Sequence, residues 1–233
     1  MHYFVLLLGP ETAEEPDAAT QAAIMADYEK FYAKAGAAIR AGDALLPSAT
    51  GMRITGGGER PVITDGPFTE GAEVAGGYFV IEAEDLDEAL GLAADIPACR
   101  LGAVEVWPMV GWSPPTRAAG RDWLALLLEP PEKACPPDTE EWNSGVCEHA
   151  QFVEMAGDHI LTGAPLHPPS TATTVRVRDG RVTLTDGPFA EGAEVANGFY
   201  LLRTTDRDEA VKLASMIPAS TVELRQLAGV GGV

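Results

Sequence analysis

The stretch DGPFTEGAEVAGGYF at residues 65–79 returns almost unchanged as DGPFAEGAEVANGFY at residues 186–200. So close a match over such a length does not arise by chance. A repeat at this spacing indicates that one structural unit occurs twice in the chain. The fold must therefore be sought in one unit of about half the chain and then in the way that two such units pack.

The likeness extends to both sides of this stretch. HYFVLLLGP from His2 aligns with DWLALLLEP from Asp122. LDEALGLAADIPA from Leu86 aligns with RDEAVKLASMIPA from Arg207. The whole domain is therefore duplicated, and not a single motif.

The join between the two copies lies near the sequence GWSPPTR at 111–117. Two prolines and a glycine give a stiff connector that is poor in hydrogen bonds. We predict a first domain over 1–112, a linker over 113–119 and a second domain over 120–233.

Apolar periodicity predicts the same order of elements in each half. In the first half we expect strand 2–8, helix 17–41, strands 51–55 and 60–64, strand 76–82, helix 85–95 and strand 103–109. In the second half we expect strand 122–128, helix 138–156, a hairpin around the turn Asp179-Gly180, strand 197–203, helix 206–216 and strand 221–227. Asp85 and Asp206 are the expected N-caps of the later helix in each half.

This order predicts an α+β protein made of two tandem ferredoxin-like plaits, each with an added hairpin. Helices cover one face of each sheet, and the other face needs a cover. A second copy in the same chain provides that cover. We therefore expect the sheets to pack face to face as an intramolecular pseudo-dimer, similar to a dimeric α/β-barrel, with a cavity between them.

The composition excludes several kinds of partner. The formal net charge is −19, from 35 acidic and 16 basic residues. Such a surface repels phosphate backbones and anionic lipids, so neither direct nucleic-acid binding nor membrane binding is expected. The acidity is explained either by solubility or by a site for a cationic ligand.

Three cysteines without C-x-x-C spacing are typical of free thiols in a reducing compartment. The apolar run that begins at His2 is short and lacks a basic flank, which favours a strand over a signal peptide. A cytoplasmic protein is expected. The four histidines show no regular spacing and no phosphate-binding loop precedes a helix, so neither a metal nor another cofactor is predicted.

The D-G-P-F-x-E segment, which follows a strand and precedes a G-[GN]-[YF] stretch, resembles the signature of YCII-related (DGPF-domain) proteins. The resemblance covers nearly all of both halves. It implies the dimeric α/β-barrel architecture, which relatives often form as homodimers. Relatives are commonly linked to extracytoplasmic-function sigma factors, so the resemblance also implies a possible sigma-factor-linked partner.

The chain departs from the family pattern at two places. Ala72 and Ala193 occupy the position where the family's DGPF-x-E-x-K-E segment has lysine. The family's last strand ends in V-E-V-R-P, whereas the first copy has Trp107 in place of the arginine. The second copy keeps Arg225 but loses the proline.

The repeated segment has a structural and a functional interpretation. Asp-Gly-Pro is turn chemistry, and the phenylalanine that follows can fill the core. In the functional interpretation the acidic groups point into a cleft, where paired carboxylates bind a cation or transfer protons. The residues predicted to bind a ligand are Asp65, Phe68, Glu70 and Glu73 in the first copy, and Asp186, Phe189, Glu191 and Glu194 in the second.

His149 is the candidate catalytic residue. The stretch HAQFV at 149–153 resembles the family's H-x-x-[FY]-[LV] pattern. In the family, a histidine on the first helix and an aspartate after the first strand are proposed to form a pair, and the acidic position falls near Glu129 here. Such a pair polarises the imidazole as a general base. The first copy has Gly9 and about Lys34 at these places, so any such chemistry is confined to the second half.

Three hypotheses follow. The leading one is a small-molecule-binding protein, with the ligand in a cleft between the sheets and a role in a regulatory pathway. The second is an enzyme that uses His149 and Glu129 for proton transfer in lactone or dehalogenation chemistry. The third is an interaction module whose acidic face binds a basic protein. For His149, the alternative is an exposed helical residue without a role.

Overall fold

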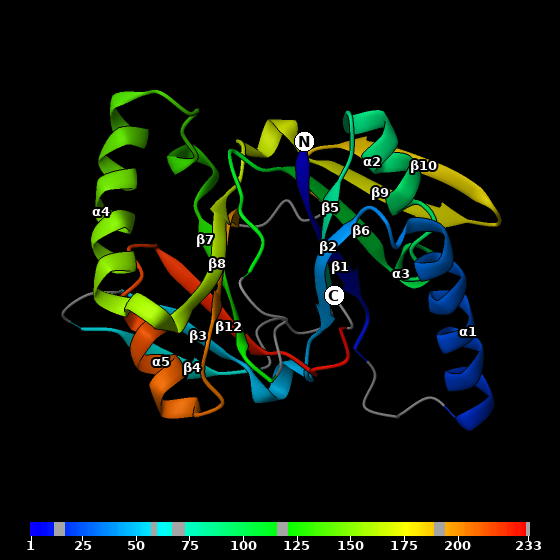
Figure 1. The fold of residues 1–233 in the computed structure, drawn as a ribbon, viewed down its shortest axis with the longest axis horizontal. Coiled ribbons are helices and arrows are strands. Elements are labelled where there is room, and N and C mark those ends of the chain that lie inside the picture. The colour runs from blue at the N-terminus through cyan, green and yellow to red at the C-terminus, as the bar shows by residue number, and fades with distance from the viewer. Residues whose placement is uncertain (12–16, 57–59, 67–72, 116–120, 189–193, 232–233) are drawn as a thin grey trace.

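The computed structural model describes residues 1–233 except 12–16, 57–59, 67–72, 116–120, 189–193 and 232–233. Its strands form two six-stranded antiparallel sheets. Helices cover the outer face of each sheet, as Figure 1 shows, with α1, α2 and α3 on one side of the molecule and α4 and α5 on the other. The predicted pair of plaits packed sheet to sheet is confirmed.

The first sheet has the strand order β10-β9-β6-β1-β5-β2. The bounds of these strands, in sheet order, are Arg181–Asp186, Thr173–Arg178, Ala103–Pro108, His2–Gly9, Val74–Glu82 and Ile39–Ala44. The second sheet has the order β4-β3-β12-β7-β11-β8. Its strands are Val62–Asp65, Met52–Thr55, Thr221–Gln226, Trp123–Glu129, Val195–Leu202 and Ile160–Pro165.

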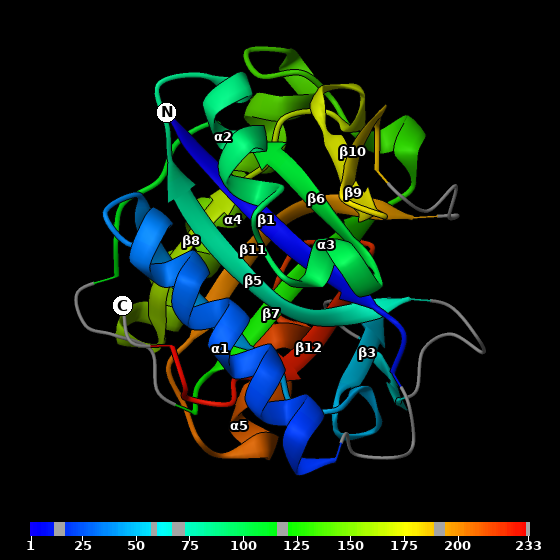
Figure 2. The same cartoon turned by 90° about the vertical axis from the view of Figure 1, so that its right-hand side faces the viewer.

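The hairpins are exchanged between the two halves. The first copy's hairpin β3–β4 joins the second sheet, where Met52 is opposite Leu224. The second copy's hairpin β9–β10 joins the first sheet, where Val175 is opposite Val104. Figure 2 shows β9 beside β6 and β3 beside β12. Each sheet therefore contains strands from both copies, and the domain boundaries at 1–112 and 120–233 remain a prediction that describes the duplication.

The first long helix is shorter than predicted. α1 spans Ala18–Ala35, and the rest of the predicted helix 17–41 lies in strand β2. β2 pairs with the edge of β5, where Gly42 is opposite Phe79. Strand β8, the counterpart of β2 in the second copy, was not predicted either. These edge strands form because β5 and β11 offer free edges, which a local sequence pattern does not reveal.

Helices α2, α4 and α5 agree with the predicted pattern, whereas the short helix α3 was not predicted. The bounds of these helices are α2 (Leu86–Ala93), α3 (Ala98–Leu101), α4 (Glu140–Ala156) and α5 (Arg207–Ser215), with short 3-10 turns η1 (Ser48–Thr50), η2 (Pro131–Lys133), η3 (Gly157–His159) and η4 (Pro169–Thr171). Asp85 and Asp206 cap α2 and α5 as predicted. Their carboxylates accept hydrogen bonds from the backbone nitrogens of Glu88 and Glu209 at 2.9 and 2.8 Å. No helix in the described part of the chain combines the length and the apolar character that crossing a bilayer requires.

The space between the sheets is filled by apolar side chains. Phe4 of the first sheet stacks on Phe199 of the second, with ring centroids 4.5 Å apart. Leu6, Trp107 and Leu126 belong to the same buried cluster. Large side chains from both inner faces interdigitate there, and a cavity between the sheets remains a prediction. Burial of this cluster is what joins the two copies.

Candidate functional site

A cavity of about 1260 Å³ lies on the helix side of the second sheet. One wall is α4, and the floor is formed by β7, β8 and β11. The far wall comes from the segment after β7 and from the loop before β12. Apolar and polar side chains share this lining, among them Leu127, Glu129, Lys133, Cys135, Trp142, Val146, His149, Asn197, Tyr200, Ile217 and Ser220.

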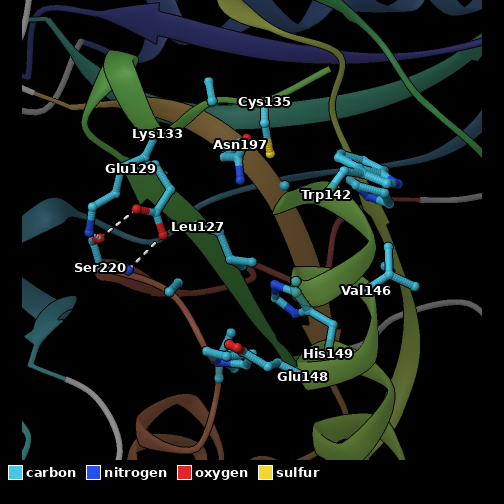
Figure 3. Close-up of a pocket in the computed structure, with 18 of the residues that line it drawn as sticks. Leu127, Glu129, Lys133, Cys135, Trp142, Val146, Glu148, His149, Asn197 and Ser220 are labelled. Atoms are coloured by element: carbon cyan, nitrogen blue, oxygen red, sulfur yellow. Dashed lines mark hydrogen bonds between the residues drawn. The ribbon is translucent and has the colours of Figure 1, made fainter. Parts of the chain in front are cut away.

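The far wall carries a chain of three polar side chains. Glu129, the last residue of β7, accepts a hydrogen bond from the backbone nitrogen of Ser220 at 2.7 Å. Its second carboxylate oxygen accepts from the Ser220 hydroxyl (Figure 3). The Lys133 ammonium donates to the same hydroxyl at 3.0 Å. The serine hydroxyl is thus held between a carboxylate and an ammonium group.

The α4 wall contributes His149, whose ring extends from the helix toward the strands (Figure 3). Its Nδ1 lies 3.0 Å from the hydroxyl of Tyr200 on β11. Burial lowers the pKa of His149, although the nearby carboxylates of Glu148 and Glu129 oppose this shift. Burial also raises the pKa of Tyr200 to about 12. At neutral pH the cavity therefore contains a neutral imidazole beside a protonated phenol.

The predicted pair of His149 and Glu129 is only partly reproduced. Both residues line the same cavity. Within the described residues, however, no hydrogen bond or ion pair joins them, because Glu129 is bound by Ser220 and His149 by Tyr200. The imidazole is oriented by a phenol where we expected a carboxylate. A catalytic role for either residue remains a prediction.

The first copy lacks most of these polar groups. Strand register matches Glu129 with Gly9 and Ser220 with Gly102, since Leu6 and Leu126 occupy equivalent central positions. The repeat matches Asn197 with Gly76 and Tyr200 with Phe79. Glycine or an aromatic ring therefore stands at each of these places.

The counterpart of His149 is Tyr28, and not Lys34 as expected. The two helices are aligned by Phe31 and Phe152, which pack their rings against Phe79 and Tyr200 at centroid distances of 5.3 and 5.1 Å. Tyr28 lies three residues before Phe31, as His149 lies three before Phe152. Burial raises the pKa of Tyr28 to about 12. The expected match with Lys34 is wrong because the segments before the two helices differ in length.

A comparison with protein-family models agrees with the duplication. The family model described as YCII-related domain matches residues 1–113 and again 130–226. The chain belongs to the YCII-related family. No curated protein matches it. A crystal structure provisionally described as a chlorite dismutase is similar at 10% identity with a TM-score of 0.45, over 97% of this chain and 94% of that chain.

In this YCII-related chain, the two described glutamates of the repeated segment, Glu73 and Glu194, do not line the cavity. Glu194 forms an ion pair with Arg53 and accepts a hydrogen bond from Thr221 Oγ1 at 2.6 Å. Glu73 is 3.4 Å from Arg176. Arg53 and Arg176 belong to the exchanged hairpins, so each glutamate binds the hairpin that the other copy contributes. This arrangement favours the structural interpretation of the segment.

The two aspartates of the segment are exposed at the ends of β4 and β10. Asp65 receives a hydrogen bond from Arg207 on α5 at 2.5 Å. Gly187, which follows Asp186, has a φ of +85°, a value that glycine adopts most easily. Neither aspartate lines the large cavity. Ligand binding by Asp65, Glu73, Asp186 and Glu194 remains a prediction, and Phe68, Glu70, Phe189 and Glu191 lie outside the described residues.

The departures from the family's last-strand pattern are compensated locally. Trp107 Nε1 donates to Glu105 at 2.9 Å in the first copy, and Arg225 donates to Glu223 at 3.1 Å in the second. The indole therefore replaces the guanidinium as a donor to the glutamate two residues earlier. Arg225 is buried and also donates to the carbonyl oxygen of Leu46 at 2.7 Å.

Of the polar residues that line the cavity, Glu129 and His149 were predicted from the sequence, whereas Lys133, Tyr200 and Ser220 were not. The sequence differs between the copies at two of these positions, because the first copy has Phe79 at the position of Tyr200 and Gly102 at the position of Ser220. These differences could have indicated the site. No group of three or more histidine, cysteine, aspartate or glutamate side chains in the described ranges is arranged to hold a metal ion.

Proposed function

We propose that this protein binds a small molecule in the cavity between α4 and the second sheet. The observation that carries the proposal is the difference between the two copies. The second copy surrounds a large cavity with hydrogen-bonding groups. The first copy has glycine at the positions that match Glu129, Asn197 and Ser220, and phenylalanine at the position that matches Tyr200. Ligand sites are typically concave, mostly apolar and equipped with a few converging polar groups. The first copy then serves as the scaffold that completes the barrel.

The lining indicates the kind of ligand. Leu127, Trp142 and Val146 offer apolar surface for a hydrocarbon or aromatic body. His149 and Asn197 offer hydrogen bonds on opposite sides of that surface. A volume of about 1260 Å³ that is open to solvent accommodates a metabolite-sized organic molecule. We therefore expect a partly apolar ligand with at least two hydrogen-bonding groups.

The test is a thermal-shift screen of metabolites and fragments on the full chain, followed by calorimetry of the hits. Ligand at a hundredfold excess over its Kd stabilises the folded state by about 2.7 kcal/mol. The blocking variant is Gly145→Trp, because a side chain at Gly145 meets open space on the cavity side of α4. The control is Gly91→Trp, at a helical glycine that also faces open space but lies outside the cavity.

Hits should stabilise the wild-type chain and Gly91→Trp equally, and Gly145→Trp little or not at all. Hits that stabilise all three proteins equally bind elsewhere and contradict the proposed site. A broad screen without any hit would count against small-molecule binding as a whole.

A second function, proton transfer at the ligand, is favoured by the contact between His149 and Tyr200. A neutral imidazole whose Nδ1 is fixed by a phenol presents Nε2 as a base or as a donor. Hits with an acidic C–H bond, such as lactones, should then exchange that hydrogen for deuterium in D2O, as followed by NMR. His149→Gln should abolish the exchange and retain binding. Exchange at the wild-type rate in this variant would exclude the imidazole as the base.

A further inference from the structure

We propose that Ser220 is a nucleophile for acyl transfer, with Glu129 as its base and Lys133 as the cation beside its oxygen. The cavity would then hydrolyse small esters or lactones. This inference rests on the proposed function, because the ester must enter the same cavity. It assigns the chemistry to the wall opposite His149.

The geometry fixes the direction of the serine proton. The Ser220 hydroxyl has one hydrogen, and it is donated to a carboxylate oxygen of Glu129. The backbone nitrogen of Ser220 binds the other carboxylate oxygen at 2.7 Å, so the carboxylate cannot rotate away. Lys133 occupies one lone pair of the serine oxygen at 3.0 Å. One lone pair of the oxygen remains for an electrophile, and Ser220 is among the residues that line the cavity.

This set of groups is not a requirement of the fold. The first copy has Gly9 and Gly102 at the positions of Glu129 and Ser220, and its strands pair with the same register. A side chain at Gly102 would place its Cβ 1.9 Å from the Leu8 carbonyl oxygen, so that copy has no room for one. At the same positions the second copy accommodates the hydroxyl of Ser220 and the carboxylate of Glu129.

The chain also contains a purely structural version of the same contact. Ser48 donates to Glu11 through its backbone nitrogen at 2.8 Å and through its hydroxyl. Ser48 is fully buried and does not line the large cavity. No lysine bonds to its hydroxyl among the described residues. Ser48 is therefore a matched reference for what a serine–glutamate contact does when it only ties two segments together.

The proposed reaction begins with attack of Ser220 Oγ on the carbonyl carbon of the ester. The hydroxyl proton passes to Glu129, and the carbonyl π electrons move to the carbonyl oxygen, where the Lys133 ammonium lies nearby. When the tetrahedral intermediate collapses, the carbon–oxygen bond to the alcohol breaks and Glu129 returns the proton to the departing oxygen. An acyl-serine remains. Water then repeats these steps, with its proton passing through Glu129 to Ser220 Oγ, and releases the acid.

Esters fit this arrangement better than amides. A carboxylate is a weak base, so it suits a leaving group that departs as an alcohol with little assistance. The apolar side chains of Trp142 and Val146 on the opposite wall provide a place for an alkyl or aryl acyl group. The expected substrates are therefore small, uncharged carboxylic esters and lactones.

The test is labelling of the full-length protein with an alkyl fluorophosphonate, followed by peptide mass spectrometry. We expect covalent phosphonylation at Ser220 and none at Ser48. Glu129→Gln, which can still accept one hydrogen bond from Ser220, should slow labelling by about 100-fold. Lys133→Met should slow it by about tenfold. Ser220→Ala should abolish it, and Ser48→Ala should leave the rate unchanged.

Melting curves establish that each variant is folded, and ligand binding in the thermal-shift assay is measured alongside. If the cavity binds ligands but Ser220 is not labelled, the nucleophile is refuted and the proposed function stands. Equal labelling of Ser220 and Ser48, or an unchanged rate in Glu129→Gln, refutes the activation of Ser220 in the same way. Loss of ligand binding in Gly91→Trp as well as Gly145→Trp contradicts the proposed function instead.

Discussion

Removal of the Glu194 carboxylate should destabilise the whole molecule, because this residue attaches the first copy's hairpin to the second copy. Glu194 forms an ion pair with Arg53, and the side chains of the two residues are 20% and 30% exposed. It also accepts a hydrogen bond from Thr221 at 2.6 Å. Hydrogen bonds to charged groups contribute about 1.5–3 kcal/mol each, whereas exposed ion pairs contribute about 0–1 kcal/mol. We therefore expect Glu194→Ala to lower the free energy of unfolding by about 2–3 kcal/mol.

The pseudo-symmetric residue gives an internal comparison. Among the described residues, Glu73 forms an ion pair with Arg176 at 3.4 Å, so Glu73→Ala should lower the free energy of unfolding by only about 1 kcal/mol. Asp186→Ala removes an exposed carboxylate from the same repeated segment and should change stability by less than about 0.5 kcal/mol. The order of the three losses follows from the contacts and does not depend on their absolute size.

The assay is urea-induced unfolding followed by circular dichroism, with tryptophan fluorescence as a second probe. The two probes should report one transition, because each sheet contains strands of both copies and neither can unfold alone. A double-mutant cycle with Arg53→Met should give a coupling energy of at least about 0.5 kcal/mol. The reasoning is refuted if Glu194→Ala and Asp186→Ala lose the same stability, or if Arg53 and Glu194 prove additive.

Three further outcomes are expected. Gly163→Ala should lower the free energy of unfolding in urea by about 1–3 kcal/mol, because the new Cβ would lie 2.4 Å from the Tyr200 ring. Gly145→Ala, at a position on α4 that meets open space, should raise it by up to about 1 kcal/mol. Asp43→Ala should lower the free energy of unfolding by about 1–3 kcal/mol and accelerate amide hydrogen exchange near the C-terminus. The Asp43 carboxylate accepts hydrogen bonds from the backbone nitrogens of Gly229, Val230 and Gly231 at 3.1, 3.1 and 3.2 Å. Because burial lowers the pKa of His149, the unfolded chain binds a proton more readily than the folded chain, so the stability of the fold should fall as the pH drops below the ordinary value of 6.5. His149→Gln should show a smaller fall in melting temperature over this pH range. An equal fall in melting temperature for both proteins would contradict the lowered pKa of His149.

Most of the strands, the positions of the long helices and the packing of two sheets could be predicted, because each depends on local periodicity or on the repeat. The hairpin turn at Asp179-Gly180 was also readable, and both residues have positive φ values of 52° and 72°. The exchange of the hairpins between the two sheets could not be predicted from the sequence. Duplication gives the chain two nearly equivalent edges, at β6 and β12, and a hairpin's own sequence does not say which of them it will join. Strands β2 and β8 were missed for a related reason, since their pairing with β5 and β11 is a long-range interaction.

Likeness between the copies predicts the ligand-binding residues of the repeated segment, whereas only His149 and Glu129 are predicted from a difference between the copies. The most similar segment contains Glu73 and Glu194, which hold the exchanged hairpins together, so its likeness reflects a structural demand that both copies share. A site used in only one copy leaves the opposite signal, since the idle copy is free to lose its polar groups or never acquires them. That signal was present at Gly9, Gly102 and Phe79, whose counterparts are the polar residues of the cavity. In a duplicated barrel of this kind, differences between the copies at positions that face a helix therefore locate the cavity better than their common motif.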